Sequence, residues 1–370
     1  MPMNPSDVLP SLRSEAKVLF IRLRSLGDTI LSIPLYAALK TWRSDLRISV
    51  LVEEPNDQVL ANNPNIDHII SIRRADGSNW KALRSRLSAL AHLRQSRFEC
   101  CINLHGGSTS AWLTALSGAR YRVGDIRFRN TIAYDLRIDS SVTPSTGTKI
   151  HTVEHQIEWL RALGLPKSDI PPSQVIPNPQ FETIAKARLI KIGLKTGNPY
   201  AVVQPTSKFY TKEWTADGFA EITDYLSIRY GLSVILTGGP GEEEKLKAVR
   251  ERSQSKPSVL TSVTISELAW IFSSASIFVG NDSGPTHLAA ALSVPVVALF
   301  GSSDSTLWHP WGVPFKIVQN PFDCNPCPGY RCLVYDEPRC ILSITSSQVK
   351  MAIDALLGDK MMDDKGERES

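Results

Sequence analysis

Residues 276–300 read SIFVGNDSGPTHLAAALSVPVVALF, and this stretch decides the fold class. Its first apolar run, 276–279, has the length of a buried strand and ends in small and polar residues. A helix is predicted over 284–292, with Pro285 in its first turn, and a second apolar strand over 294–300. A strand, a turn, a helix and another strand at this pitch are typical of a parallel sheet covered by helices.

The same rhythm occurs on both sides of a proline-rich stretch between Gly164 and Pro179, which we interpret as a linker. Before the linker, the predicted strands are 17–23, 47–52, 68–72 and 100–104, and the predicted helices are 29–43 and 82–93. After it, the further predicted strands are 200–203 and 232–237, and the further predicted helices are 216–230, 242–251, 266–272 and 343–357. Near-continuous apolar strands indicate burial on both faces of each sheet.

The fold class is therefore α/β, with two doubly wound, Rossmann-like domains. Their boundaries are expected at 1–170 and 180–345, followed by a segment 346–370 whose helix could cross back to the first domain and whose tail is loose. Two such domains facing each other would hold a ligand in the cleft between them, at the carboxyl ends of the strands.

Length and composition agree with this organisation. A chain of 370 residues, at ~150 residues per domain, predicts roughly two domains. Hydrophobic residues make up 42% and charged residues 21%, which is typical of a globular protein and excludes a disordered one. No apolar run approaches the ~18 to 20 residues of a membrane-spanning helix, and the N-terminus has no apolar signal core. We expect a cytoplasmic protein whose six cysteines form no structural disulfide.

The net charge of +4 is unevenly distributed. Residues 1–170 carry 22 Lys and Arg against 16 Asp and Glu, and the rest of the chain carries 19 against 21. Between 73 and 97 there are seven basic residues and a single acid, Asp76. A one-sided positive field favours an anionic partner such as a nucleic acid, an anionic lipid or a phosphorylated substrate. A solvated helix face is the alternative.

The loop at the end of the 276–279 strand has the features of an anion site. Asp282 or Ser283 can cap the helix that follows, and its free N–H groups and dipole attract a phosphate. Asp282 and His287 flank this position. In the structural alternative, Asp282 is only a cap and His287 only packs at a domain interface.

Three more loops carry polar residues next to a predicted strand. Between 204 and 214, hydroxyl and ammonium groups suit a diphosphate, and a lysine there can neutralise the charge on a departing phosphate; they belong to Thr206, Ser207, Lys208 and Lys212. In Thr237-Gly-Gly-Pro-Gly-Glu242, the Glu242 carboxylate could bind ribose hydroxyls or simply favour the start of a helix. In Gly27-Asp28, the carboxylate could take a proton from an attacking hydroxyl or cap the next helix.

Several common motifs are missing. The sequence has no G-x-G-x-x-G, no G-x-x-x-x-G-K-[ST] and no G-x-S-x-G, which disfavours a dinucleotide oxidoreductase, a P-loop NTPase and a hydrolase elbow. One C-x-x-C, Cys324 to Cys327, is followed by Cys332 and Cys340. Reduced thiols are the favoured interpretation, and a structural metal or a redox disulfide are the alternatives.

The motifs IRLRSLGDTILSIP (21–34) and GNDSGPTHLAA (280–290) resemble glycosyltransferase family 9, the ADP-heptose:lipopolysaccharide heptosyltransferases. Thr237-Gly-Gly-Pro240, Gly301-Ser-Ser-Asp304 and Pro310-Trp-Gly312 follow in the family's order, so the resemblance covers about 17–355. The cysteine-rich stretch and the first-domain motif are most similar to the heptosyltransferase III branch.

The resemblance implies a GT-B fold and an inverting transfer from a nucleotide-sugar without a metal or other cofactor. In this family picture Asp28 is the general base, Lys212 steadies the leaving diphosphate, Glu242 binds ribose and Val263 packs the adenine. The remaining donor-binding positions are Thr206, Ser207, Lys208, Asp282, Ser283, Gly284 and His287.

The implied partners are ADP-heptose and a phosphorylated lipopolysaccharide core at the inner leaflet of the membrane, with no nucleic acid. The basic first domain would meet the acceptor through Arg73, Arg74 and Arg84. The alternatives are a family member that uses another nucleotide-sugar and a non-catalytic, basic-faced binding module with the same fold.

Overall fold

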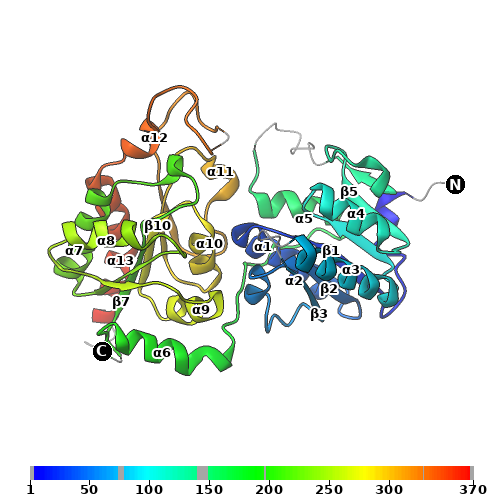
Figure 1. The fold of residues 1–370 in the computed structure, drawn as a ribbon, viewed down its shortest axis with the longest axis horizontal. Coiled ribbons are helices and arrows are strands. Elements are labelled where there is room, and N and C mark those ends of the chain that lie inside the picture. Colours follow the sequence, from blue (N-terminus) through cyan, green and yellow to red (C-terminus); the bar gives the residue numbers. More distant parts are fainter. Residues whose placement is uncertain (1–3, 74–78, 140–148, 196, 328, 367–370) are drawn as a thin grey trace. The chain divides into compact units, whose positions relative to one another are not determined.

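The chain forms two compact units, residues 1–176 and 177–370, in a computed structural model (Figure 1). The structure describes residues 4–73, 79–139, 149–195, 197–327 and 329–366. Each unit contains a sheet of six parallel strands with helices packed on it. The predicted α/β class is confirmed. None of the described helices combines the length and the apolarity that a bilayer crossing needs.

The first unit has the strand order β3-β2-β1-β4-β5-β6. The strands are β1 (Lys17–Ile21), β2 (Arg47–Glu53), β3 (His68–Ile72), β4 (Cys100–Asn103), β5 (Tyr121–Asp125) and β6 (Leu136–Ile138). The helices are α1 (Leu26–Ile30), α2 (Ile33–Trp42), α3 (Asn79–Ser96), α4 (Ser108–Leu116) and α5 (Thr152–Ala162). Strands β1, β2 and β4 are almost entirely buried, as expected for a sheet covered on both faces.

The second unit repeats this topology with the order β12-β11-β10-β7-β8-β9. Its strands are β7 (Tyr200–Gln204), β8 (Ser233–Thr237), β9 (Ser258–Leu260), β10 (Ile277–Asn281), β11 (Val296–Leu299) and β12 (Phe315–Val318). Its helices are α6 (Glu182–Lys191), α7 (Ala216–Tyr230), α8 (Glu243–Arg252), α9 (Ile265–Ser273), α10 (Gly284–Ala291), α11 (Ser305–Trp308), α12 (Arg339–Leu342) and α13 (Ser346–Gly366).

Two predicted helices differ from the observed ones. The helix expected over 29–43 is divided into α1 and α2, because Pro34 lacks an N–H group and occupies the first turn of a new helix. The last helix, expected over 343–357, is α13. Its Val349, Ile353 and Leu357 lie in the hydrophobic core of the second unit, and it packs on β12 and α7.

Candidate active site

The strand order brings two pairs of loops together. In the second sheet β7 lies beside β10, with Gln204 next to Gly280, so the loops that follow these strands leave the same edge. In the first sheet β1 lies beside β4, with Ile21 next to Asn103. The strand order reverses at both places, and open parallel sheets bind ligands at such points. A site in either unit is therefore expected at these loops.

A lysine and an aspartate meet at the switch point of the second unit. Lys212 ends a short 3₁₀ turn after β7, and Asp282 follows β10 directly. The Lys212 Nζ lies 2.7 Å from Asp282 Oδ2. The Asp282 side chain is 6% exposed and that of Lys212 21% exposed. The carboxylate therefore holds the ammonium group at the edge of the sheet, where a ligand can reach it.

Asn281, which the sequence analysis gave no role, fixes this arrangement. Its Oδ1 accepts a hydrogen bond from the Trp214 N–H at 3.1 Å, and its Nδ2 donates to the Pro205 carbonyl at 2.9 Å. The Thr286 hydroxyl donates to the Asn281 carbonyl at 2.6 Å. Asn281 is fully buried. Its side chain connects the end of β10 to the Lys212 loop, and its carbonyl connects it to the first turn of α10.

Glu242 belongs to a hydrogen-bonded network beside this pair. Its Oε2 accepts from the Thr206 hydroxyl and from the Gly239 N–H, each at 2.6 Å. The Gln204 side chain continues the network, donating to Thr206 Oγ1 and accepting from Thr237 Oγ1, again at 2.6 Å each. Both bonds to Glu242 end on Oε2, so Oε1 retains the capacity to accept from a ligand hydroxyl.

The start of α10 completes the cluster on this edge. Ser283 is the N-cap residue, Gly284 opens the helix and Pro285 lies in the first turn, as predicted. The Ser283 side chain makes no capping hydrogen bond, and the Asp282 carboxylate pairs with Lys212. The N-terminal end of α10, where the helix dipole is positive, therefore begins directly after Asp282, the partner of Lys212. His287 is buried in the same helix.

The other donor-side residues have different surroundings. The Ser207 N–H donates to the Glu213 carboxylate at 2.9 Å. Lys208 is exposed, and its ammonium lies 5.5 Å from the centroid of the Phe209 ring. Val263 is half-buried in the loop between β9 and α9. Of the two lysines, the structure pairs Lys212 with the acidic side chain of the switch point.

In the first unit, Asp28 lies in the first turn of α1, after β1. Its Oδ2 accepts from the Ser25 N–H at 3.1 Å and from the Ser25 hydroxyl at 2.9 Å, which forms a capping box. Its Oδ1 lies 3.7 Å from Arg22 Nη1, and the side chain is 27% exposed. Oδ2 thus caps the start of α1, and Oδ1 lies beside the guanidinium group of Arg22.

Two further residues at this point were missed by the sequence analysis. Arg22 is 8% exposed, and its Nε has no hydrogen-bond partner among the described residues. His105 follows β4; burial lowers its pKa, and the nearby charges of Arg22 and Arg24 lower it further, while Asp28 raises it. Burial and the neighbouring arginines thus favour the neutral form of the imidazole. The sequence could have indicated His105 as a site residue, because it comes directly after the predicted strand 100–104.

Three arginines were predicted to bind the acceptor, and the structure describes two of them. The Arg73 side chain is exposed, and its Nε lies 4.0 Å from Glu54 Oε2. Arg84 is exposed on α3. Arg74 lies outside the described residues.

Two doubly wound units, each with polar loops at its switch point, define the GT-B class of fold. The model of glycosyltransferase family 9 (heptosyltransferase) matches residues 86–336, more than half of the chain. This chain belongs to that family, as the motifs predicted.

Known proteins of the family agree with this assignment. The chain is 28% identical to lipopolysaccharide heptosyltransferase 3 of Escherichia coli, over 78% of this chain and 84% of that protein. A glycosyltransferase family 9 structure from Veillonella parvula aligns with a TM-score of 0.80 at 22% identity, covering 94% of this chain and 98% of that one. E. coli heptosyltransferase WaaC with ADP-2-deoxy-2-fluoro heptose aligns with a TM-score of 0.69 at 21% identity, covering 92% and 99%.

Proposed function

We propose that this chain is an inverting glycosyltransferase that moves a heptose from ADP-heptose to the inner core of lipopolysaccharide. The observation that carries the proposal is the Lys212–Asp282 pair at the switch point of the second sheet, beside the Glu242–Thr206 network. The printed names of the relatives supply the donor and the acceptor: they are lipopolysaccharide heptosyltransferases, one with a fluorinated ADP-heptose.

The second unit binds the donor. Lys212 and the α10 N-terminus supply positive charge to the diphosphate, and the Ser207 hydroxyl can donate a hydrogen bond to it. The Thr206 hydroxyl donates to Glu242 and so holds the ribose-binding carboxylate in place. Glu242 accepts from the ribose hydroxyls, and the apolar Val263 packs on the adenine. Asp282 and His287 orient Lys212 and the sugar hydroxyls.

Asp28 of the first unit acts on the acceptor. The acceptor hydroxyl gives its proton to Asp28 while its oxygen forms a bond to the anomeric carbon of the donor. The bond from that carbon to the diphosphate oxygen breaks, ADP leaves and the anomeric configuration is inverted. Lys212 compensates the charge that develops on the leaving ADP, so no step requires a metal ion.

A panel of nucleotide-sugars tests this function. ADP-heptose is expected to release ADP rapidly only when de-lipidated core acceptor is present, and UDP- or GDP-sugars are expected to be poor donors. Rapid release from another nucleotide-sugar would assign a different donor. No release from any member of the panel, together with no thermal shift by ADP, would favour a non-catalytic module.

Glu242→Gln is expected to weaken ADP binding about ten- to hundredfold, because a hydrogen bond to a charged group contributes about 1.5–3 kcal/mol. Calorimetry with ADP and 2′-deoxy-ADP measures this, and the variant should no longer distinguish the two nucleotides. Glu243→Gln is the matched control, since Glu243 is exposed in the same helix turn. If the Glu242→Gln protein preferred ADP to 2′-deoxy-ADP as strongly as the wild type does, Glu242 would not be the residue that binds the ribose.

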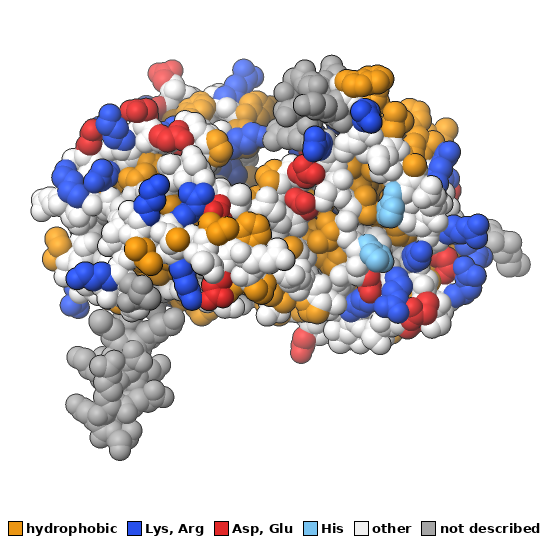
Figure 2. Space-filling model, turned by 60° about the horizontal axis from the view of Figure 1, so that its bottom comes forward, with side chains coloured by type: hydrophobic (Ala, Val, Ile, Leu, Met, Phe, Trp, Pro, Cys, Tyr) orange, Lys and Arg blue, Asp and Glu red, His pale blue; other side chains and the backbone are white. Residues whose placement is uncertain are grey.

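The acceptor is attached to a lipid, and helix α3 has a face suited to an anionic membrane surface. Trp80, Leu83 and Leu87 are 68%, 44% and 56% exposed. At 100° per residue they lie on one side of the helix, opposite the buried Ala89 and Leu93. Helix α3 contains no Asp or Glu. Over the first unit as a whole, at the right of Figure 2, Lys and Arg side chains lie among Asp and Glu side chains.

Arg84 and Arg94 lie on the same exposed side of α3 as the apolar stripe. Exposed apolar side chains flanked by basic ones are typical of a helix that lies in the interface of an anionic bilayer. We therefore place the peripheral contact with the inner leaflet on this face of the first unit.

Trp80→Ser combined with Leu87→Ser is expected to reduce binding to phosphatidylglycerol vesicles about tenfold, a loss of about 1.4 kcal/mol. Co-sedimentation measures it, with transfer to a de-lipidated acceptor expected to be unchanged. Ile228→Ser is the control, because Ile228 is 75% exposed on α7 of the second unit. Equal binding by all three proteins would place the membrane contact elsewhere.

A further inference from the structure

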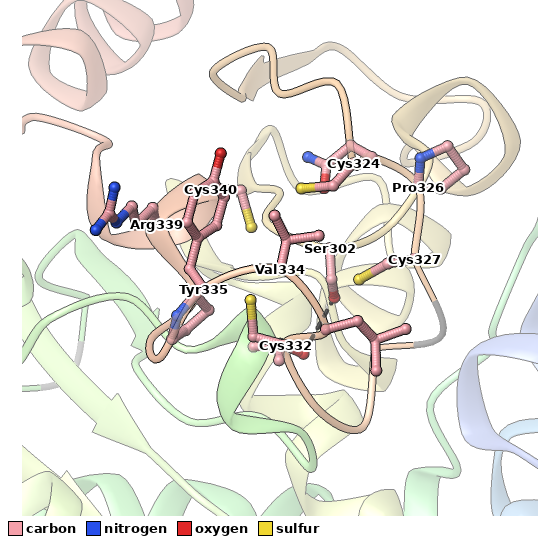
Figure 3. A pocket seen from close by; sticks show the side chains of 13 residues that line it. Ser302, Cys324, Pro326, Cys327, Cys332, Val334, Tyr335, Arg339 and Cys340 are labelled. Carbon is pink, nitrogen blue, oxygen red and sulfur yellow. Dashed lines mark hydrogen bonds between the residues drawn. The ribbon is translucent and has the colours of Figure 1, made fainter.

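Four of the six cysteines line one pocket in the second unit. The pocket has a volume of about 220 Å³, and its cysteines are Cys324, Cys327, Cys332 and Cys340. Figure 3 shows their sulfur atoms arranged around the same space, with Val334 among them and Ser302 nearby. All four are free thiols. The proposed transfer reaction uses none of them.

Three of these cysteines belong to a long loop, residues 319–338, between β12 and α12. None of the described residues of this loop lies in a helix or a strand. Loops of this length in a compact domain are uncommon without a function or an additional constraint. Hydrogen bonds hold it at a few points, including Cys327 N–H to the Ser302 carbonyl at 3.0 Å and Asn325 Nδ2 to the Gly301 carbonyl at 2.8 Å.

The loop also encloses the turn that carries Lys212. The Cys332 N–H donates to the Tyr210 hydroxyl at 2.9 Å. The Thr211 hydroxyl donates to the Gly329 carbonyl and lies 3.1 Å from Ser302 Oγ. A methyl group on Gly329 would lie 3.7 Å from the Lys212 Cε. The loop is therefore hydrogen-bonded to Tyr210 and Thr211, the two residues that precede Lys212.

Four thiols are the ligand set that zinc and iron prefer in structural sites, commonly with two of them in a C-x-x-C. Cys324 and Cys327 provide that pair, and Cys332 and Cys340 approach from later parts of the chain. Among the described residues, no three Cys, His, Asp or Glu side chains are already gathered as ligands of one ion. The thiols line the pocket without forming such a group, so their side chains have to turn toward a common ion when it binds, as in other sites where metal binding and local folding are coupled.

We propose that Cys324, Cys327, Cys332 and Cys340 bind one thiophilic divalent metal ion, which holds the described parts of the 319–338 loop against the turn that carries Lys212. The cysteines bind as thiolates, so their protons are released to solvent when the ion enters. The ion serves the structure and takes no part in the transfer. The metal site stands independently of the proposed transferase activity; only its effect on Lys212 depends on that function.

Metal analysis of the full chain tests the site. Protein from cells grown with zinc and iron, purified under reducing conditions without chelator, is expected to contain one metal ion per chain. Removal of the ion by a chelator should make the four thiols react with a disulfide reagent, and added Zn²⁺ should protect them again. A metal content near zero together with no protection of any thiol by Zn²⁺ would overturn the proposal.

Cysteine variants distinguish a specific loss of metal binding from a general loss of stability. Cys324→Ser and Cys332→Ser are each expected to lower the metal content below one tenth per chain, whereas Cys100→Ala, in the buried β4 strand of the first unit, should retain it. The same two serine variants should raise the KM for ADP-heptose several-fold and make the 319–338 loop more sensitive to protease. Measurement of Zn²⁺ protection in the wild type does not depend on how well the variants fold. Full metal content in both serine variants would contradict the assignment.

Discussion

Asp28→Asn is expected to reduce transfer to a lipopolysaccharide core acceptor by about 10²- to 10⁴-fold, the range that a positioned general base contributes. Asparagine can still accept the hydrogen bonds from the Ser25 N–H and hydroxyl, so the start of α1 should remain intact. The charge that accepts the proton is lost, whereas the donor-binding residues of the second unit are untouched. Steady-state transfer rates and calorimetric binding of ADP-heptose measure the two effects separately.

Ser25→Ala is the matched control for this result. It removes the hydroxyl that donates to Asp28 Oδ2 but leaves the carboxylate in place. A loss of about 0.5–2 kcal/mol of folding free energy is expected from the weakened cap, with a much smaller effect on the rate. Near wild-type turnover by Asp28→Asn would show that Asp28 is not the base.

Lys212→Ala is expected to reduce kcat by roughly 100-fold or more, because removal of one well-placed group that stabilises developing charge costs about 10²- to 10³-fold. Lys212 is held by Asp282 at 2.7 Å, whereas Lys208 is exposed. Lys208→Ala should therefore change the rate by only a few-fold. An unchanged rate in Lys212→Ala with a large loss in Lys208→Ala would move the role to Lys208.

The Lys212 variant needs a measure of stability beside the rate. Its removal leaves the buried Asp282 carboxylate without its cation, and such groups destabilise the folded state when one partner is lost. Combining Lys212→Ala with Asp282→Asn removes the unpaired charge, so a melting temperature restored in the double variant with a rate still low would separate catalysis from folding.

The central strands of both sheets could be predicted because they are buried on both faces. All five residues of Tyr200–Gln204 are buried, for example, and the apolar run is visible in the sequence. Three of the four edge strands were not predicted, and the fourth, His68–Ile72, was. Leu136–Ile138 and Ser258–Leu260 are three residues long and partly exposed, so they show neither a long apolar run nor a clear alternation. Their existence depends on pairing with a neighbouring strand.

The residues of the candidate site could likewise be predicted only in part. Lys212, Asp282 and Glu242 were predicted because charged side chains stand out in loops after apolar strands. Their partners were not, since the contact of Lys212 with Asp282 joins residues 70 positions apart through the pairing of β7 with β10. The charge of Arg22 lowers the pKa of His105 for the same reason, because β1 pairs with β4. Sequence spacing carries no record of such pairings.

A crystal structure of the chain with ADP-2-deoxy-2-fluoro heptose and a core acceptor tests the central claim most directly. The account predicts that Lys212 Nζ lies within about 3 Å of a diphosphate oxygen and that the Asp28 carboxylate lies within about 3 Å of the acceptor hydroxyl, on the opposite side of the anomeric carbon. A complex with the donor bound in which Asp28 lies on a surface remote from the anomeric carbon would contradict it.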